Sequence, residues 1–159
     1  MQKKERIKRI MKKKIYFDMD GTLCDLCGVE NWLFKLQNSD ASPYREAKPL
    51  IKFSHFARMV HKLQEAGYTV GIISWLSKNG STEYNAEVTK AKMEYLAKHF
   101  KSVHFDEIHI VTYGTPKCLF APDHCYLFDD EEKNRLQWNG TAFDEKNILE
   151  ILKMLLTKA

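Results

Sequence analysis

The sequence predicts an α/β fold in which a central, mainly parallel β-sheet lies between two layers of helices. Short apolar runs typical of buried strands alternate with stretches whose apolar residues keep helical spacing. Three of these apolar runs end in acidic or hydroxyl residues. The 159 residues, 44% hydrophobic and 29% charged, suit one globular domain and exclude a disordered chain, a collagen and a small disulfide scaffold.

Five strands are expected, and they alternate along the chain with helices. The apolar runs predict them at residues 14–18, 69–74, 108–111, 125–128 and 141–143. Strands that alternate with helices in this way favour parallel pairing, with helices on both faces of the sheet.

Five helical segments are expected between and after these strands. They are a short helix at 31–38, one from about 52 to 66 ended by Gly67, a long helix capped by Ser81 or Thr82, a short one ended by Gly140, and a last helix from Ile148. On the long helix, apolar spacing predicts an inner face of Met93, Leu96, Ala97 and Phe100.

Positive charge is concentrated at the start of the chain. Eight of the first 14 residues are Lys or Arg, although the net charge is only +4. We interpret residues 1–13 as a basic, disordered extension and residues 14–159 as a single domain. Alternatively, residues 1–10 are a segment upstream of a start at Met11. A nucleic-acid or membrane-surface arm is the less favoured alternative.

No apolar run is long enough to cross a bilayer, and no signal-peptide pattern follows the basic start. We therefore expect a cytoplasmic protein with no membrane partner. In that compartment the four cysteines are expected to be reduced and unligated, with zinc binding around Cys24 and Cys27 as the alternative.

Chemistry is expected at the carboxyl ends of the strands, where ligands bind in sheets of this kind. The first strand ends at Asp18 and is followed by Asp20, the second ends at Ser74, and the fourth is followed by Asp129 and Asp130. Carboxylates brought together there repel one another unless a cation lies between them. Mg²⁺ suits such oxygen ligands best, together with phosphate.

The spacing of the first motif suggests roles in phosphoryl transfer. Asp18 can attack phosphorus as a carboxylate nucleophile, and Asp20 can act as general acid and later as base. Gly21 permits a sharp turn whose backbone N–H groups, with the neighbouring Met19 and Thr22, are expected to bind phosphate oxygens. Ser74 and the adjacent Trp75 are placed to contact the phosphoryl group or the substrate, and a lysine is still needed to neutralise charge.

The residues Asp18-Met-Asp20-Gly-Thr22, Ser74, a lysine and Asp129-Asp130 resemble, in that order, the haloacid dehalogenase (HAD) superfamily of phosphotransferases. The resemblance covers the chain from about residue 14. It implies a Rossmann-like three-layer sandwich, an aspartyl-phosphate on Asp18, and Asp20 as acid and base. It also implies Mg²⁺ held by Asp18, the backbone carbonyl of Asp20, and one or both of Asp129 and Asp130, with Ser74 binding phosphate. The acid at position 20 favours a phosphatase.

Two lysines are candidates for the phosphate-binding lysine of this family. Lys92 lies on the long helix, in a stretch similar to that of 5'(3')-deoxyribonucleotidases, and it is favoured. Lys117 precedes the fourth strand and is expected to be a second cation near the mouth of the site.

A minimal helical cap is expected at about residues 24–49, between the first motif and the core helix. So small a cap predicts a fairly open site, and Trp32, Phe34 and Tyr44 are placed either to stack on a substrate ring or to pack the cap.

The deoxyribonucleotidase similarity makes a nucleoside 5'-monophosphate the first substrate to test, although Ser74-Trp75 departs from that family's Thr-Ser-Pro run. The alternatives are a phosphatase of sugar phosphates or other small phosphomonoesters, a phosphatase of nucleic-acid ends, and a phosphate-binding module without catalysis. The presence of both Asp18 and Asp20 argues against the last.

Overall fold

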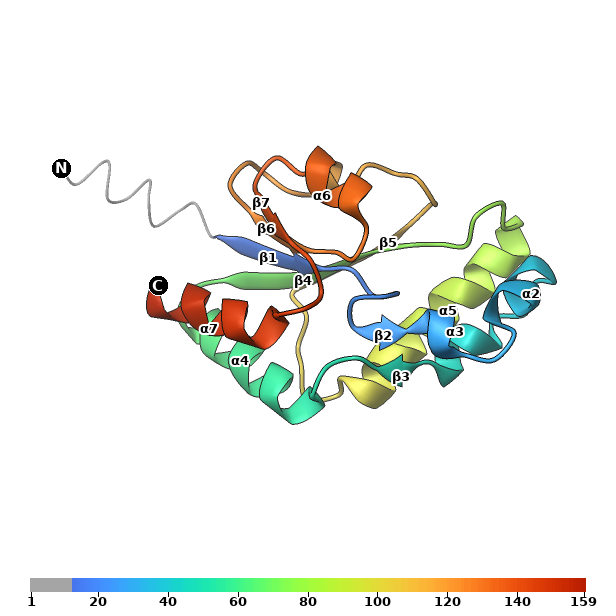
Figure 1. The fold of residues 1–159 in the computed structure, drawn as a ribbon, viewed down its shortest axis with the longest axis horizontal. Coiled ribbons are helices and arrows are strands. Elements are labelled where there is room, and N and C mark those ends of the chain that lie inside the picture. Colours follow the sequence, from blue (N-terminus) through green and yellow to red (C-terminus); the bar gives the residue numbers. More distant parts are fainter. Residues whose placement is uncertain (1–12) are drawn as a thin grey trace.

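A computed structural model describes residues 13–159, so the predicted basic extension lies almost wholly outside the described residues. Five parallel strands form one sheet, in the order β5 (Glu107–Val111), β4 (Thr69–Trp75), β1 (Lys14–Phe17), β6 (Tyr126–Phe128) and β7 (Thr141–Phe143) (Figure 1). All five predicted strands are therefore confirmed, each within two residues of its expected bounds.

The order of the strands places three polar strand ends side by side. β1 lies between β4 and β6, and Phe17 is in register with Ile72 on one side and Phe128 on the other. The residues that follow Phe17 and Phe128, together with the end of β4, therefore meet at one edge of the sheet.

Side chains alternate between the two faces of the sheet and give it two cores. Ile15, Phe17 and Phe128 pack on one face against α4 (Phe53–Glu65), α7 (Ile148–Thr157) and the last turns of α5 (Thr82–His99). Tyr16 and Leu127 pack on the other face, which the shorter α6 (Glu132–Gln137) and the 3₁₀ helix η2 (Lys117–Phe120) cover (Figure 1). The structure thus confirms the predicted three layers.

The buried face of α5 differs from the prediction. Met93 is 42% exposed and Ala97 is exposed, so these two do not belong to the inner face. The apolar spacing misplaced this face because it contains a buried lysine and two tyrosines. Its buried members are Tyr84, Val88, Ala91, Lys92, Tyr95 and Leu96.

The sequence pattern predicts that Gly140 ends a helix, and this prediction is wrong. α6 already ends at Gln137, and a Cβ at Gly140 would overlap the backbone of Cys125, which directly precedes β6. The absence of a side chain at Gly140 therefore lets its backbone lie close to that of Cys125.

Residues 24–49 form a small inserted segment at the right of Figure 1. It contains β2 (Cys24–Asp25), the 3₁₀ helix η1 (Leu26–Gly28), α2 (Trp32–Gln37), α3 (Ser42–Glu46) and β3 (Lys48–Pro49), and β2 pairs antiparallel with β3. The segment packs on α5, where Tyr44 and Leu26 share an apolar cluster with Tyr84 and Val88.

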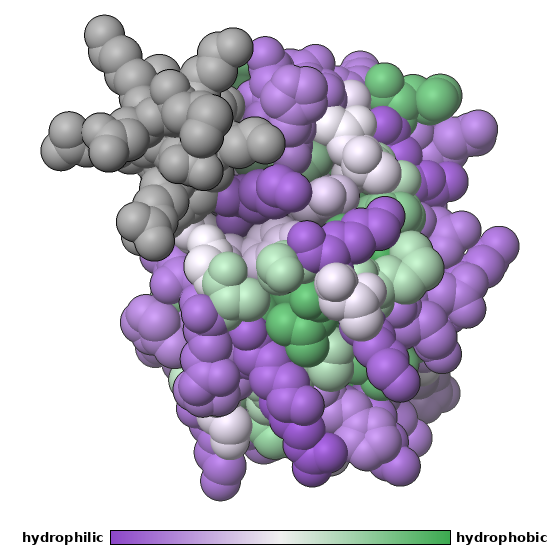
Figure 2. All heavy atoms as spheres, turned by 90° about the vertical axis from the view of Figure 1, so that its left-hand side faces the viewer, coloured by the Kyte–Doolittle hydropathy of each residue, from purple (hydrophilic) through white to green (hydrophobic). Residues whose placement is uncertain are grey.

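The side of the molecule away from this segment is mainly hydrophilic, with a small apolar strip at its centre (Figure 2). Within residues 13–159, no helix combines the length and the apolar character that a membrane crossing requires.

Candidate active site

Three carboxyl groups converge at the carboxyl end of the sheet. Asp18 follows β1 and Asp129 and Asp130 follow β6, and one oxygen atom of each lies within 4.8 Å of the others. Asp129 is fully buried and Asp18 is only 7% exposed. The backbone of both strands fixes this arrangement, because the Asp18 amide still donates to the carbonyl of Phe128 at 2.9 Å.

The proximity of these carboxyl groups disfavours their full ionisation. Burial, and then the charge of Asp18, raise the pKa of Asp130 to about 8. The same two causes raise the pKa of Asp129 to about 6, against the opposing effect of the Lys117 ammonium. The cluster therefore favours either bound protons or a cation. Its hard oxygen donors fit a divalent ion such as Mg²⁺.

Lys117 is buried between the ends of β1 and β6. Its Nζ donates to Asp18 Oδ1 at 2.8 Å and to Asp129 Oδ2 at 2.7 Å, and it lies 5.4 Å from the centre of the Trp75 ring. Burial disfavours the ammonium form, but the two carboxylates outweigh it and raise the pKa of Lys117. With 3% of its surface exposed, Lys117 is deeper than the site-mouth position expected from the sequence.

Lys92 reaches the same region from α5 but contacts different residues. Its Nζ donates to Asp20 Oδ2 at 2.8 Å, to Ser74 Oγ at 2.7 Å and to the Trp75 carbonyl at 2.6 Å. Both candidate lysines are thus in the site, and Lys117, not Lys92, pairs with Asp18.

The turn after Asp18 uses some of the groups that were expected to bind phosphate. The N–H of Gly21 donates to the Cys24 carbonyl at 2.8 Å, and that of Thr22 to the Met19 carbonyl at 3.1 Å. The Thr22 hydroxyl donates toward Asp18 and Asp130 and accepts from the Asp130 amide at 3.2 Å. These two residues therefore shape the turn and the acidic cluster, because their amides are already bonded within it.

Gly21 is also the position where the turn comes closest to the acidic cluster. Its φ is +81°, and a Cβ there would overlap the carboxyl group of Asp130. The glycine is thus required both by backbone conformation and by space.

A cleft of about 650 Å³ opens onto the carboxylates. Its walls come from the inserted segment, the loop after β4, and the loops around Tyr113 and Glu131. Six of the predicted site residues line it, namely Asp18, Asp20, Gly21, Trp75, Lys117 and Asp130. The other predicted residues lie behind these walls, namely Met19, Thr22, Ser74, Lys92 and Asp129.

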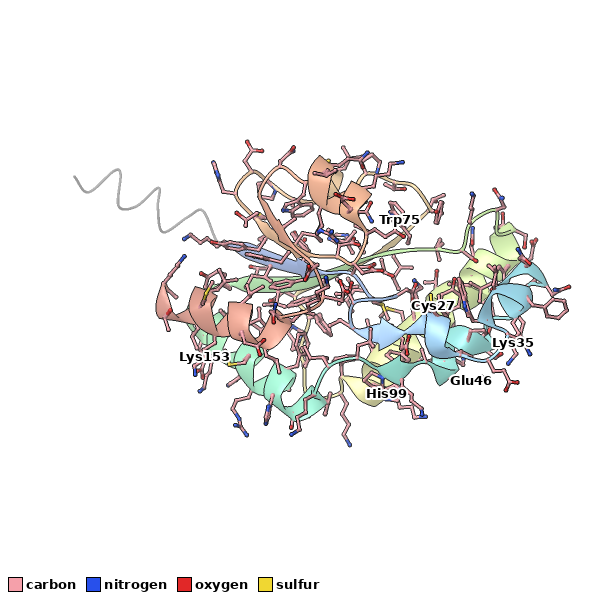
Figure 3. The ribbon with its side chains drawn as sticks, in the orientation of Figure 1. Cys27, Lys35, Glu46, Trp75, His99 and Lys153 are labelled. Carbon is pink, nitrogen blue, oxygen red and sulfur yellow. The ribbon has the colours of Figure 1, made fainter. Side chains whose placement is uncertain are left out.

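The inserted segment forms one wall of the cleft. Trp32 and Tyr44 line it, whereas Phe34 is 67% exposed and is not among its lining residues. Figure 3 labels Cys27 and Trp75, which line the cleft from the inserted segment and from the end of β4. Trp75 is fixed by a hydrogen bond from its Nε1 to the Thr115 carbonyl at 2.8 Å, so its ring faces Lys117.

Two residues of α6 donate hydrogen bonds to the acidic pair, and they were not identified from the sequence. Asn134 Nδ2 donates to Asp129 Oδ2 at 3.1 Å, and Arg135 donates to the backbone carbonyls of Asp129 and Asp130 at 3.0 and 2.8 Å. Asn134 and Arg135 follow Asp129 by five and six residues, on the helix that begins just after the acidic pair, and this position is the signal that could have indicated them.

Comparison with known proteins supports the fold but gives no family assignment. No protein-family model matches the sequence, and a search of the curated proteins finds no match. Among solved structures, D,D-heptose 1,7-bisphosphate phosphatase from Burkholderia thailandensis aligns with a TM-score of 0.54 at 14% identity, covering 92% of this chain and 99% of the other.

The corresponding phosphatase from B. bronchiseptica, solved with magnesium and phosphate, aligns with a TM-score of 0.53 at 11% identity and the same coverage. Both are sugar-bisphosphate phosphatases, and neither supports the similarity to deoxyribonucleotidases. Over nearly its whole length, the chain therefore shares the α/β fold of these two phosphatases.

Proposed function

We propose that this protein is a magnesium-dependent phosphomonoester hydrolase that works through an aspartyl-phosphate on Asp18. One observation carries the proposal. Asp18 lies at the floor of a cleft, beside the acidic cluster and the Lys117 ammonium, and Asp20 lines the same cleft two residues further on.

Asp18 and Asp20 have different roles in the proposed reaction. The Asp18 carboxylate attacks phosphorus and forms a P–O bond as the ester P–O bond breaks, and Asp20 gives its proton to the departing oxygen. Asp20 then takes a proton from water, whose oxygen attacks phosphorus. The acyl-phosphate bond breaks, which releases phosphate and restores the Asp18 carboxylate.

Lys117 is the better candidate for the phosphate lysine, in place of Lys92. An ammonium group has three N–H donors, and two of those on Lys117 are bonded to Asp18 and Asp129. The third can donate to a phosphate oxygen, as can the backbone N–H group of Asp20, which lines the cleft and for which the described residues provide no acceptor. The role of Ser74 in phosphate binding stays a prediction.

Asp18, Asp129 and Asp130 would hold Mg²⁺ in this proposal, with the backbone carbonyl of Asp20 as the further ligand that the resemblance implies. The ion would neutralise charge on the phosphoryl group when bound. The neighbour solved with magnesium and phosphate supports this choice of ion.

The cleft favours a compact monophosphate. Apart from Lys117, Lys78 is the one cationic side chain among the described residues that line it, and Lys78 lies 6.0 Å from the Tyr113 ring centre. A second phosphate group would have few cations to bind. Sugar monophosphates are thus the first substrates to test, given the sugar-phosphate neighbours, and nucleoside monophosphates come second because aromatic Trp32 and Tyr84 line the cleft.

Release of inorganic phosphate tests the proposal. Purified protein with Mg²⁺ should hydrolyse at least one sugar or nucleoside monophosphate, and Asp18→Asn should abolish the reaction while leaving the circular dichroism spectrum unchanged. Excess EDTA should stop it and added Mg²⁺ restore it. Turnover by Asp18→Asn at the wild-type rate would exclude the aspartyl-phosphate route.

A further inference from the structure

We propose that Lys92 is a positioning residue that holds the acid/base Asp20 in place and does not bind the substrate phosphate. The inference rests on the proposed function, because it assigns a role within that reaction.

All three N–H donors of Lys92 are already engaged. They bond to Asp20 Oδ2, Ser74 Oγ and the Trp75 carbonyl at 2.6–2.8 Å, which satisfies the full donor capacity of an ammonium group. A phosphate could bind Lys92 only by displacing one of these acceptors.

Lys92 is also shielded from the cleft. The residue is 1% exposed, and it is absent from the lining of the cleft, whereas Asp20 and Lys117 are part of that lining. The ring of Tyr44, which belongs to the inserted segment, has its centre 5.0 Å from the Nζ of Lys92. Lys92 therefore acts from behind Asp20, and Lys117 faces the substrate.

The contacts of Asp20 explain why it needs such support. Asp20 belongs to a tight turn rather than to a strand, and its side chain keeps 27% of its surface exposed. Lys92 fixes Oδ2, and the Cys24 thiol contacts Oδ1 at 3.8 Å. Since Ser74 and Trp75 belong to β4, Lys92 ties the turn after β1 to the neighbouring strand.

A comparison of Lys92→Met with Lys117→Met tests this division of roles. The measurements are kcat/KM for an alkyl phosphate and for p-nitrophenyl phosphate, and the inhibition constant of inorganic phosphate. Protonation by Asp20 matters most for the alkyl ester, because its leaving group is the more basic. Lys92→Met should therefore reduce kcat/KM about tenfold or more for the alkyl phosphate and far less for p-nitrophenyl phosphate. Phosphate inhibition should stay within about twofold of wild type for Lys92→Met and weaken for Lys117→Met.

A double-mutant cycle with Asp20→Asn gives the second readout. If Lys92 acts through Asp20, adding Lys92→Met to Asp20→Asn should cause no further loss of kcat/KM on the alkyl phosphate. Lys90→Met is the matched control, because Lys90 is exposed on the same helix, and it should change none of these values. Where circular dichroism shows that Lys92→Met is unfolded, Lys92→Gln, which keeps a donor group, enters the same cycle.

The inference would be overturned if Lys92→Met lowered kcat/KM equally for both esters, weakened inhibition by phosphate, and had an effect additive with that of Asp20→Asn. Lys92 would then be a phosphate ligand. A wild-type protein that releases no phosphate from any ester would instead contradict the proposed function.

Discussion

Two buried lysines share the carboxylates of the candidate site between them. Lys117 pairs with Asp18 and Asp129, and Lys92 pairs with Asp20. A buried charge is tolerable only when it is paired and hydrogen-bonded, so each lysine supports its aspartates and depends on them. The contacts that position the proposed catalytic groups therefore also keep each buried charge paired, and removing one partner should destabilise the fold.

Lys117→Met should destabilise the protein and inactivate it. The substitution leaves Asp18 and Asp129 buried without their cation, which costs about 3–5 kcal/mol of unfolding free energy in the absence of Mg²⁺. Urea unfolding measures this loss, and phosphate release should fall by about 100-fold or more. Stability and activity equal to wild type would show that the ion pairs contribute to neither.

The carboxyl cluster makes stability depend on pH in an unusual direction. The folded state raises the pKa of Asp130 from 3.8 to about 8, so between these values the folded protein holds a proton that the unfolded chain releases. The contribution of this group to the unfolding free energy therefore falls as pH rises through that interval. Mg²⁺ competes with the proton, so it should raise the melting temperature more at pH 8 than at pH 5.5, as thermal unfolding can measure. Asp130→Asn should reduce this difference, and a magnesium effect independent of pH would contradict the expected competition.

At the scale of elements, the strand ends could be predicted and the orientation of the helices could not. Asp18, Ser74 and Asp129 were identified because each closes or follows an apolar run, and parallel strands bring such ends to one edge. The contacts of Lys92 and Lys117 were not predictable. Those of Lys92 depend on which face of α5 is buried, and those of Lys117 depend on how η2 packs against the sheet. The apolar pattern of α5 suggested Met93 as an inner residue, whereas the chain buries the charged Lys92.

The inserted segment is held to α5 mainly by burial, with a smaller contribution from ion pairs. Tyr84 is buried, and its hydroxyl donates to the Asp40 carbonyl at 3.0 Å, whereas Arg45 pairs with Glu87 and Glu94 at the surface. Exposed ion pairs contribute little, and a hydrogen bond from a buried group contributes about 1 kcal/mol.

Tyr84→Phe should therefore weaken the wall of the cleft more than Arg45→Ala does. The first variant loses the bond to Asp40, and because Tyr84 also lines the cleft we expect a higher KM together with about 1 kcal/mol less stability. Arg45→Ala serves as the control and should change stability by less than about 1 kcal/mol with KM unaffected. Urea unfolding and steady-state kinetics compare the two, and a larger effect of Arg45→Ala would show that surface charge anchors the segment.

At the scale of the whole molecule, the candidate active site and the start of the described chain lie at opposite ends of the sheet. Lys14 begins β1, whereas Asp18 follows its carboxyl end, beside the inserted segment (Figure 1). The cleft carries acidic side chains and two lysines, and one of these lysines is paired with aspartates. Such a cleft suits a small ester better than a polyanion, since nucleic acids are bound through many cationic contacts with phosphate groups.

Deletion of residues 1–10 distinguishes a small-molecule phosphatase from a phosphatase of nucleic-acid ends. These residues hold five of the 25 Lys and Arg residues and one Glu, so their net charge is +4. Because β1 starts at the end of the sheet away from the cleft, the deletion should leave kcat/KM on a sugar or nucleoside monophosphate within about twofold of wild type at every salt concentration. The parallel assay uses a 5'-phosphorylated oligonucleotide, on which both proteins should be weakly active with the same dependence on salt. The opposite result has two parts: the full chain is much more active on the oligonucleotide, and the deletion removes both that advantage and the steep loss of activity with salt. In that case the basic segment would be a nucleic-acid anchor, and the small monophosphate would not be the preferred substrate.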